Sequence, residues 1–306
     1  MEYKTFDEVV QKVRGISRRR CGVVAGAEDR HVLEAVLEAE AEGIAVPVLV
    51  GNAAEIARIL KTLDHDPGSC RIVDAAPGEN SSQRAVEVIL SGEGDFLIKG
   101  KLDTKDILKA VVDRRNNLHR EGGLMSHLAF FQVPGERKLM AHSDGGMIVY
   151  PDLKTKKGIL LNALDALKRM GYEWPKVAVL CAVEKINEKM RETIDARDLA
   201  EMYKDGLLPD CVLEGPVSYD IALRPDIAEL KGYESPNCGN FDLFIVPDLA
   251  SGNLLGKCLT VSAHAEMAGI VVGARIPIVL TSRGASAAEK FNSIALCALI
   301  AEGWGI

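Results

Sequence analysis

Short apolar runs rich in β-branched residues alternate with amphipathic stretches along the chain, and this alternation limits the fold more than any other feature of the sequence. The runs are apolar at consecutive positions, which is typical of parallel strands that helices cover on both faces. The sequence therefore predicts an α/β fold with strands at residues 21–26, 46–51, 95–100, 124–133, 176–183, 211–216, 241–248 and 270–282. Apolar residues spaced at i, i+3 and i+4 predict helices at residues 29–43, 52–64, 103–114 and 156–171.

The chain is long enough for about two domains, because a single hydrophobic core rarely serves 306 residues. The strongest break in the middle third is Val133-Pro134-Gly135-Glu136, where proline and glycine interrupt the apolar pattern. We therefore expect a domain boundary near residue 135. The residues alone leave open whether the last strand and helix return to the first domain.

Charge and composition exclude several classes of protein. Acidic residues outnumber basic ones, 44 to 37, and the net charge of −7 argues against nucleic-acid binding. No apolar run reaches the roughly 18 residues of a membrane helix, and the charged amino terminus does not resemble a secretory signal. Seven scattered cysteines and six histidines without paired spacing favour neither disulfides nor a metal site. We expect a cytoplasmic protein with no nucleic-acid, membrane or metal partner.

The nucleotide-binding motifs that the sequence comes near are incomplete. Residues 252–258 approach a phosphate-binding P-loop, but one residue is missing between the glycines and Cys258 replaces the hydroxyl that would bind magnesium. Gly92-Glu93-Gly94 lacks the third glycine of a dinucleotide-binding loop and precedes a strand. Both motifs are therefore rejected.

Four predicted strands end in polar residues, at the sheet edge where open α/β sheets bind ligands. The four ends are Lys99-Gly100-Lys101, Glu214-Gly215-Pro216, Asp248 with the later Asn253, and Thr281-Ser282-Arg283. In the last of these, a hydroxyl and a guanidinium precede a glycine and a helix amino terminus, an arrangement that suits an anion or a developing oxyanion.

Glu289 admits two interpretations. The segment Ser286-Ala287-Ala288-Glu289 has the pattern of a capping box, in which the Glu289 carboxylate bonds back to the Ser286 amide. The same carboxylate lies seven residues after Ser282 and would also suit a catalytic base. The residues leave both interpretations open.

Two basic clusters also occur, and the first of them admits two interpretations. Residues 113–123, which include Arg115 and Arg120, form either a solvated helix end or a loop that grips a phosphate ahead of the strand at Leu124. A second cluster is expected on a solvated helical face and consists of Lys154, Lys156 and Lys157.

With these residues, the sequence resembles the phosphate acetyl/butyryltransferase family over nearly the whole chain, and most of all its butyryltransferase branch. Each matching motif is weak by itself, whereas their order and spacing are specific. The matching segments are Lys99-Gly100, Leu124-Met125-Ser126-His127, Ser143-Asp144, residues 175–180, Glu214-Gly215-Pro216, Val246-Pro247-Asp248 with Gly252-Asn253, residues 268–274 and Thr281-Ser282-Arg283.

The resemblance implies a two-domain α/β/α fold like that of isocitrate and isopropylmalate dehydrogenases, with a mostly parallel sheet and an interdomain cleft. It assigns residues 1–135 and 268–306 to the first domain, which carries the Ser-Arg site, and residues 136–267 to the second. It also implies a homodimer or a larger homo-oligomer.

The implied reaction is reversible acyl transfer, in which butyryl-CoA and phosphate give butyryl phosphate and CoA. Coenzyme A is a substrate, and no permanently bound cofactor or metal is implied. The family motifs assign Ser282 and Arg283 to the reacting centre and Glu289 to the base that accepts the CoA thiol proton. The residues expected to bind the substrates are Lys99, Arg115, Arg120, Ser126, Asp144, Asp248 and Asn253.

The chain departs from the family pattern at several positions. Butyryltransferases usually read Ser-Arg-Ala-Asp-Ser where this chain has Gly284 and Ala285, and Gly284 is closer to the acetyltransferase pattern. The usual Asp-Ala-Ala-Met-Asn is Asp144-Gly145-Gly146-Met147-Ile148 here, and Ile221 replaces an Asn-type residue. The alternatives are therefore a phosphate acetyltransferase or a catalytically altered member that binds CoA esters. A dehydrogenase of the same fold is a weaker third reading, because the sequence lacks clustered aspartates and an adenine-binding loop.

Overall fold

The computed structural model describes residues 2–75, 80–120, 123–282 and 284–301, and the chain forms two compact units. The terminal unit comprises Thr5–Gly123 and Met267–Ile306, and the central unit comprises Met1–Lys4 and Leu124–Glu266. Among the helices of the described residues, none has the length and apolar character that a membrane span requires.

The boundary expected near residue 135 falls inside the central unit. Residues 133–136 form the turn between β5 (Ser126–Gln132) and β6 (Met140–Ser143), which pair antiparallel. The chain returns to the terminal unit at Met267, beside the expected position 268. Proline and glycine mark hairpin turns and linkers alike, so the sequence by itself does not distinguish the two.

The strands of the terminal unit follow the order β3-β2-β1-β4-β11-β10. Neighbours pair in parallel, except for β10 and β11, which pair antiparallel. Val23, Val24 and Leu97 are completely buried, as their consecutive apolar positions predicted. The strands are β1 (Arg20–Ala25), β2 (Ala45–Gly51), β3 (Arg71–Asp74), β4 (Phe96–Lys99), β10 (Glu266–Val272) and β11 (Ile278–Val279).

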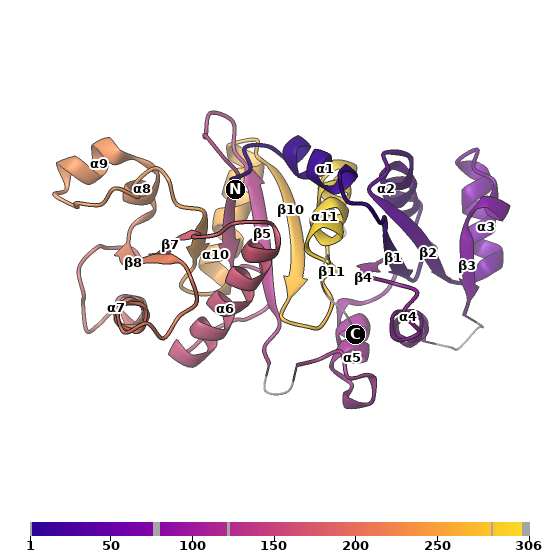
Figure 1. Cartoon of the computed structure of the whole chain (residues 1–306), viewed down its shortest axis with the longest axis horizontal. Coiled ribbons are helices and arrows are strands. Elements are labelled where there is room, and N and C mark those ends of the chain that lie inside the picture. Colours follow the sequence, from indigo (N-terminus) through magenta and orange to yellow (C-terminus); the bar gives the residue numbers. More distant parts are fainter. Residues whose placement is uncertain (1, 76–79, 121–122, 283, 302–306) are drawn as a thin grey trace. The chain divides into compact units, whose positions relative to one another are not determined.

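Helices cover both faces of these strands. Figure 1 shows α1, α2 and α11 on one face, where α11 packs against the other two, with α4 and α5 on the other face. The α2 helix begins after Asp29, whose carboxylate accepts a hydrogen bond from the Val32 amide at 3.0 Å. The helices are α1 (Phe6–Arg14), α2 (Arg30–Ala41), α3 (Ala53–Thr62), α4 (Ser81–Leu90), α5 (Thr104–Val112) and α11 (Ala287–Ile300), with short 3₁₀ turns η1 (Pro67–Ser69) and η2 (Arg114–Asn116).

The strand order creates a switch point beside β1. The chain runs from β1 to β2 and β3 on one side, and it then returns to β4 on the other side of β1. Connections that leave adjacent parallel strands in opposite directions open a crevice at the carboxyl ends of those strands. Because β11 pairs in parallel with β4, its carboxyl end reaches the same edge of the sheet.

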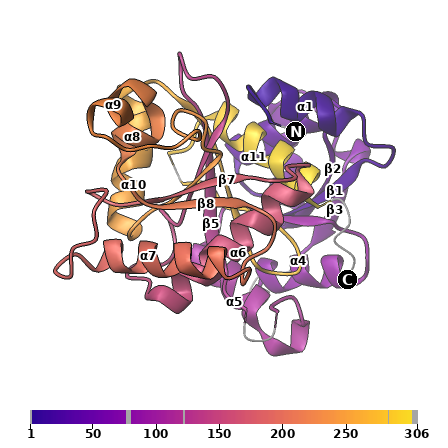
Figure 2. The same ribbon diagram turned by 60° about the vertical axis from the view of Figure 1, so that its left-hand side comes forward.

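The strands of the central unit follow the order β5-β6-β9-β7-β8 and pair in parallel, apart from β5 with β6. Figure 2 shows α6 and α7 together along one side of these strands and α8 and α9 on the other side. The remaining elements are α6 (Leu153–Arg169), β7 (Lys176–Leu180), α7 (Arg191–Lys204), β8 (Val212–Val217), α8 (Tyr219–Leu223), α9 (Pro225–Leu230), β9 (Leu243–Ile245), α10 (Leu249–Lys257) and the π-helical turn η3 (Cys258–Ser262).

Most predicted strands and helices are present, and the α/β prediction with a mostly parallel arrangement is confirmed. The stretch 270–282 is not a single strand, because a turn divides it into the antiparallel β10 and β11. Two strands were not predicted, β3 and β6. Each is four residues long and contains charged or polar side chains, so neither has the continuous apolar run of a central strand.

The expectation that Lys156 lies on a solvated helical face is wrong. Lys156 is buried in α6, and its Nζ lies 2.9 Å from Oδ2 of buried Asp195 on α7. The Arg191 Nε also lies 3.0 Å from Oδ1 of this carboxylate. An ion pair of this kind joins the two helices, and its loss would leave a buried carboxylate poorly compensated.

We therefore expect Lys156→Met to lower the free energy of unfolding by about 3 kcal/mol, the lower end for a broken buried pair, because Arg191 still faces Asp195. The matched control is Lys154→Met at an exposed position of the same helix, with an expected change within about 0.5 kcal/mol. Urea denaturation measures both values. Equal, small effects of the two substitutions would contradict a structural role for the Lys156 ion pair.

Candidate active site

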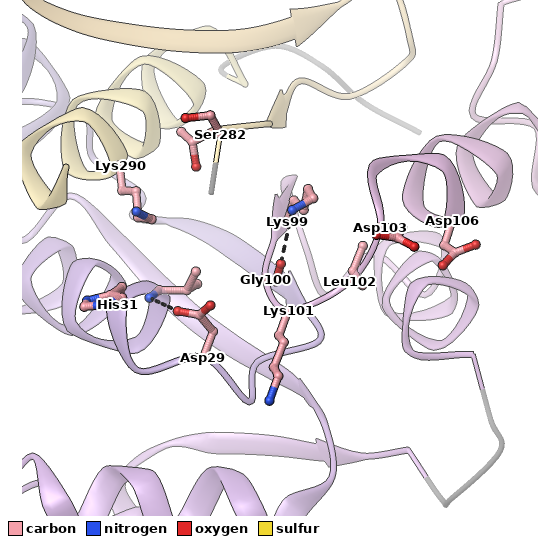
Figure 3. A pocket seen from close by; sticks show the side chains of 12 residues that line it. Asp29, His31, Lys99, Gly100, Lys101, Leu102, Asp103, Asp106, Ser282 and Lys290 are labelled. Carbon is pink, nitrogen blue, oxygen red and sulfur yellow. Dashed lines mark hydrogen bonds between the residues drawn. The ribbon is translucent and has the colours of Figure 1, made fainter. Parts of the chain in front are cut away.

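A pocket of about 710 Å³ lies at the carboxyl ends of β1, β4 and β11, in the terminal unit. This position is the switch point where the strand order predicts a ligand-binding crevice. Figure 3 shows the side chains that line it. They come from the loop and helix after β1, the loop after β4, the loop after β11 and the first turn of α11, and are Asp29, His31, Val32, Lys99, Gly100, Lys101, Leu102, Asp103, Asp106, Thr281, Ser282 and Lys290.

The loops after β1 and β4 lie against each other at two glycines. The Gly100 amide donates to the Ala25 carbonyl at 2.9 Å, and the Lys101 amide donates to the Gly26 carbonyl at 2.7 Å. A Cβ atom at Gly100 would overlap the Gly26 carbonyl oxygen, so this position excludes any side chain. The close approach places Lys99 and Lys101 on either side of Gly100, and both line the pocket.

Cations and carboxylates both line this pocket. The lysines are Lys99, Lys101 and Lys290, and the carboxylates are Asp29, Asp103 and Asp106. The Asp29 carboxylate already caps α2 through the Val32 amide. Lys290 is 8% exposed, the most buried of the three lysines, and sequence reasoning missed it. The sequence could have indicated its burial. The helix is apolar on nearly all sides, and such a helix is expected to be buried together with the few polar residues that it contains.

Ser282, assigned to the reacting centre by the resemblance, is exposed and lines the pocket. Arg283 lies outside the described residues. Glu289 is half-buried in the first turn of α11 and is not among the described residues that line the pocket. Burial raises the pKa of the Glu289 carboxyl, and the nearby charge of Lys290 opposes this shift.

The helix cap at Ser286 uses the backbone of Glu289. The Ser286 Oγ accepts a hydrogen bond from the Glu289 amide at 3.0 Å, which is one half of the predicted capping box. For these two described residues, no bond from the Ser286 amide to the Glu289 carboxylate is present. Capping therefore does not occupy the carboxylate.

Arg115 and Arg120 do not line this pocket. Arg115 forms an ion pair of 2.6 Å with Asp113 at the start of η2 and lines a separate pocket beside Asn116. Arg120 is exposed. The second cation that we expected from this basic cluster is therefore not among the described residues of the pocket, which has Lys99 and Lys290 instead.

The other expected substrate-binding residues belong to the central unit, where Asp144 and Asn253 come together. Asp144 is buried, and its carboxylate accepts backbone hydrogen bonds from His127 at 2.8 Å and from Gly146 and Met147 at 2.7 Å. The Asn253 Nδ2 donates to the Gly145 carbonyl at 3.3 Å. The Asp144 carboxylate thus organises a backbone turn, to which Asn253 is bound.

Asp248 and Ser126 also make local contacts in the central unit. The Asp248 carboxylate caps α10 and accepts from the amide and the hydroxyl of Ser251, both at 2.8 Å. Ser126 is completely buried at the start of β5, and Asn162 Nδ2 donates to its Oγ at 3.1 Å. The substrate-binding roles of these two residues, and of Asp144 and Asn253, stay predictions.

Buried His142 and partly buried His127 lie beside this turn. Neither was predicted as a site residue, although His127 lies in one of the segments that match the family. The Nδ1 atoms of His127 and His142 are buried without a hydrogen-bond partner among the described residues. A Cβ atom at Gly146 would lie 2.7 Å from the His127 ring. Glycine therefore makes the room for this ring where the family usually has alanine. Burial lowers the pKa of both histidines, to about 3 for His142, whose pKa the neighbouring His127 lowers further.

Comparison with known proteins places the chain in a family. The family model described as phosphate acetyl/butaryl transferase matches residues 77–298. The chain belongs to the phosphate acetyl/butaryl transferase family. It is 38% identical to phosphate butyryltransferase of Clostridium acetobutylicum, over 97% of this chain and 98% of that protein. It is also 37% identical to phosphate acetyltransferase of Thermotoga maritima, over 97% and 99% of the two chains.

Solved structures agree with this family assignment. The crystal structure of a branched-chain phosphotransacylase from Enterococcus faecalis matches with a TM-score of 0.83 at 27% identity, over 92% of this chain and 99% of that one. For the fold alone, 4-hydroxythreonine-4-phosphate dehydrogenase from Klebsiella pneumoniae matches with a TM-score of 0.58 at 16% identity. The resemblance to the transferase family and the expectation of a dehydrogenase-like fold are confirmed.

The lowered pKa values of His127 and His142 predict that the fold is sensitive to acid. Near and below pH 6.5 the unfolded chain binds more protons at His127 and His142 than the folded chain does, so the free energy of unfolding falls as the pH decreases. For His142 this slope approaches 1.4 kcal/mol per pH unit, roughly, until its folded-state pKa of about 3 is reached.

We expect His142→Met to reduce the slope of unfolding free energy against pH between pH 7.5 and 5, roughly by the contribution of one histidine. Urea denaturation across this range measures the slope. The control is His264→Asn at an exposed position, where the φ of 54° suits asparagine, and its slope should equal that of the parent protein. An unchanged slope in His142→Met would show that the folded and unfolded chains protonate His142 alike, and would contradict the prediction.

Proposed function

We propose that this chain catalyses reversible transfer of a short acyl group between coenzyme A and inorganic phosphate, with butyryl preferred to acetyl. The observation that carries the proposal is the pocket at the switch point of a phosphate acetyl/butaryl transferase family member, which Ser282, Lys99 and Lys290 all line. A hydroxyl donor and ammonium groups at one strand edge suit a substrate with phosphoryl oxygens and a reacting carbonyl.

Acyl transfer proceeds directly between the two bound substrates. In one direction, a phosphate oxygen attacks the thioester carbonyl carbon and the C–S bond breaks, so that CoA leaves as its thiolate. In the other direction, the thiolate attacks the acyl phosphate carbonyl and the bond to phosphate breaks. No covalent enzyme intermediate is needed, because holding both reactants together supplies much of the rate enhancement.

Each direction passes through a tetrahedral oxyanion, which needs donors aimed at the former carbonyl oxygen. Ser282 lines the pocket and supplies a hydroxyl, and Arg283 follows it in the sequence. A single well-placed donor lowers the barrier by roughly 3 kcal/mol. We assign this role to the two residues together.

Glu289 is the proposed base in the direction that consumes CoA. A thiol of pKa near 8.5 is mostly protonated at neutral pH, so proton transfer to a carboxylate raises the thiolate fraction. The burial that raises the Glu289 pKa makes this carboxylate a stronger base. Its carboxylate is available because the helix cap uses only the Glu289 amide.

We also propose a cytoplasmic homodimer or larger homo-oligomer. The family resemblance supports the assembly, and the scattered, odd number of cysteines suits a reducing compartment. Light scattering of the purified chain measures the number of subunits.

The proposed reaction is tested by phosphate-dependent release of free thiol from acetyl-, propionyl- and butyryl-CoA. We expect the highest kcat/KM with butyryl-CoA and at least a hundredfold lower kcat in Arg283→Ala, the loss typical of a removed oxyanion donor. A preference for acetyl-CoA would favour the phosphate acetyltransferase alternative. CoA binding by calorimetry without turnover of any ester would favour a binding protein, for which the departures at Ala285, Ile148 and Ile221 already provide a reason.

The role of Glu289 is tested by Glu289→Gln in the direction that consumes CoA. We expect kcat to fall by about 100-fold or more, within the range for general base catalysis. In the parent protein, activity should fall as the pH decreases through the raised Glu289 pKa, because the protonated carboxyl accepts no proton. This acid limb should disappear in Glu289→Gln.

The matched control for this test is Glu38→Gln, at an exposed position on α2 outside the pocket, and it should keep both the kcat and the acid limb of the parent protein. Because Glu289→Gln leaves the amide that caps α11 intact, a loss of activity does not arise from a lost cap. An acid limb that persists in Glu289→Gln would assign the base to another group.

A further inference from the structure

The described residues include three buried lysines, and two of them have carboxylate partners. Lys138 Nζ lies 2.5 Å from Asp242 Oδ1, and Lys156 Nζ lies 2.9 Å from Asp195 Oδ2. Each pair places opposite charges in contact, which is the usual condition for burying an ammonium group. The third buried lysine, Lys290, differs from both.

Lys290 is buried with a neutral partner. Its Nζ donates to the Ala285 carbonyl at 2.5 Å, and no aspartate or glutamate in the described part of the chain forms an ion pair with it. The charge of Lys290 partly opposes the rise that burial causes in the pKa of its neighbour Glu289. The two side chains are nevertheless not within ion-pair distance. A buried ammonium compensated only by a carbonyl carries an unbalanced positive charge, which an incoming anion would neutralise.

The Lys290 side chain faces the pocket. Figure 3 shows it extending from α11 into the pocket, on the side where Ser282 lies, with Lys99 on the segment across from it. Lys290 is the fourth residue of α11, near the helix end where the dipole disfavours a cation and favours an anion. Position and charge therefore both favour a ligand with negatively charged oxygens.

From these contacts we infer that Lys290 binds the phosphoryl group that the transfer reaction consumes and forms. The inference rests on the proposed function, which supplies inorganic phosphate and acyl phosphate as ligands. The phosphate groups of CoA have the same chemistry, so the experiment has to separate the two sources. Lys290 acts here as a binding residue, and the attacking oxygen, the carbonyl carbon and the leaving thiolate need no proton from it.

The test measures KM for each substrate separately in Lys290→Met. A lost charge-assisted hydrogen bond should raise KM for phosphate about 10- to 100-fold, while KM for butyryl-CoA stays within about twofold. Lys290→Arg keeps the charge and should recover most of the phosphate affinity. Lys105→Met, at an exposed position on α5 outside the pocket, should leave both constants unchanged.

A second variant covers the case in which Lys290→Met does not fold. Lys290→Gln removes the charge but keeps a polar side chain that can still donate to the Ala285 carbonyl, so it should also raise KM for phosphate. A rise in KM for butyryl-CoA alone would assign Lys290 to a CoA phosphate and overturn the inference. Unchanged constants in both variants would overturn it as well.

Phosphate binding without turnover separates this inference from the proposed reaction. In buffers of equal ionic strength, phosphate in place of chloride should raise the melting temperature of the parent protein and of Lys105→Met by the same amount, and should raise that of Lys290→Met by much less. This outcome would support the Lys290 site even if no CoA ester were turned over. Equal shifts in all three proteins would reject the site whatever the activity.

Discussion

The close approach of two backbone turns, at Gly26 and Gly100, is the constraint on which the candidate active site depends. The turns follow β1 and β4, the two parallel strands at the switch point, and they hydrogen-bond to each other with no room for a side chain at Gly100. This contact fixes Lys99 and Lys101 at the strand edge. Because β11 pairs with β4, Ser282 reaches the same edge from the far end of the chain. The pocket is therefore a product of strand register.

The buried lysines of this molecule have two kinds of partner. In the central unit, buried lysines meet aspartates, as Lys156 meets Asp195 between α6 and α7. Such pairs join neighbouring elements and leave no charge to offer a ligand. In the terminal unit, Lys290 donates a hydrogen bond to the Ala285 carbonyl and faces a pocket. The partner therefore distinguishes a structural lysine from one that suits an anion, although both lysines are buried.

Three departures from the family pattern can be related to the contacts that these residues make in the structure. Ile221 is completely buried in an apolar cluster with Phe244 and Val246, where an aliphatic side chain packs well. Gly146 accommodates the His127 ring, which a Cβ atom at that position would approach within 2.7 Å. Ala285 presents its carbonyl to Lys290. These three departures therefore each belong to a local set of contacts, in which close packing restricts the side chains that fit.

The sequence by itself determined the fold class, the family and the strand ends that carry Lys99 and Ser282, because apolar periodicity and motif order are local properties of a chain. It did not distinguish the hairpin at residues 133–136 from a domain linker, and it misplaced Lys156 on the surface. Only the tertiary structure decided which polar side chains share a pocket. It placed Lys290 and Ser282 in one pocket with Lys99 and kept Arg115 out of it, because the walls of the pocket come from segments that are distant in sequence.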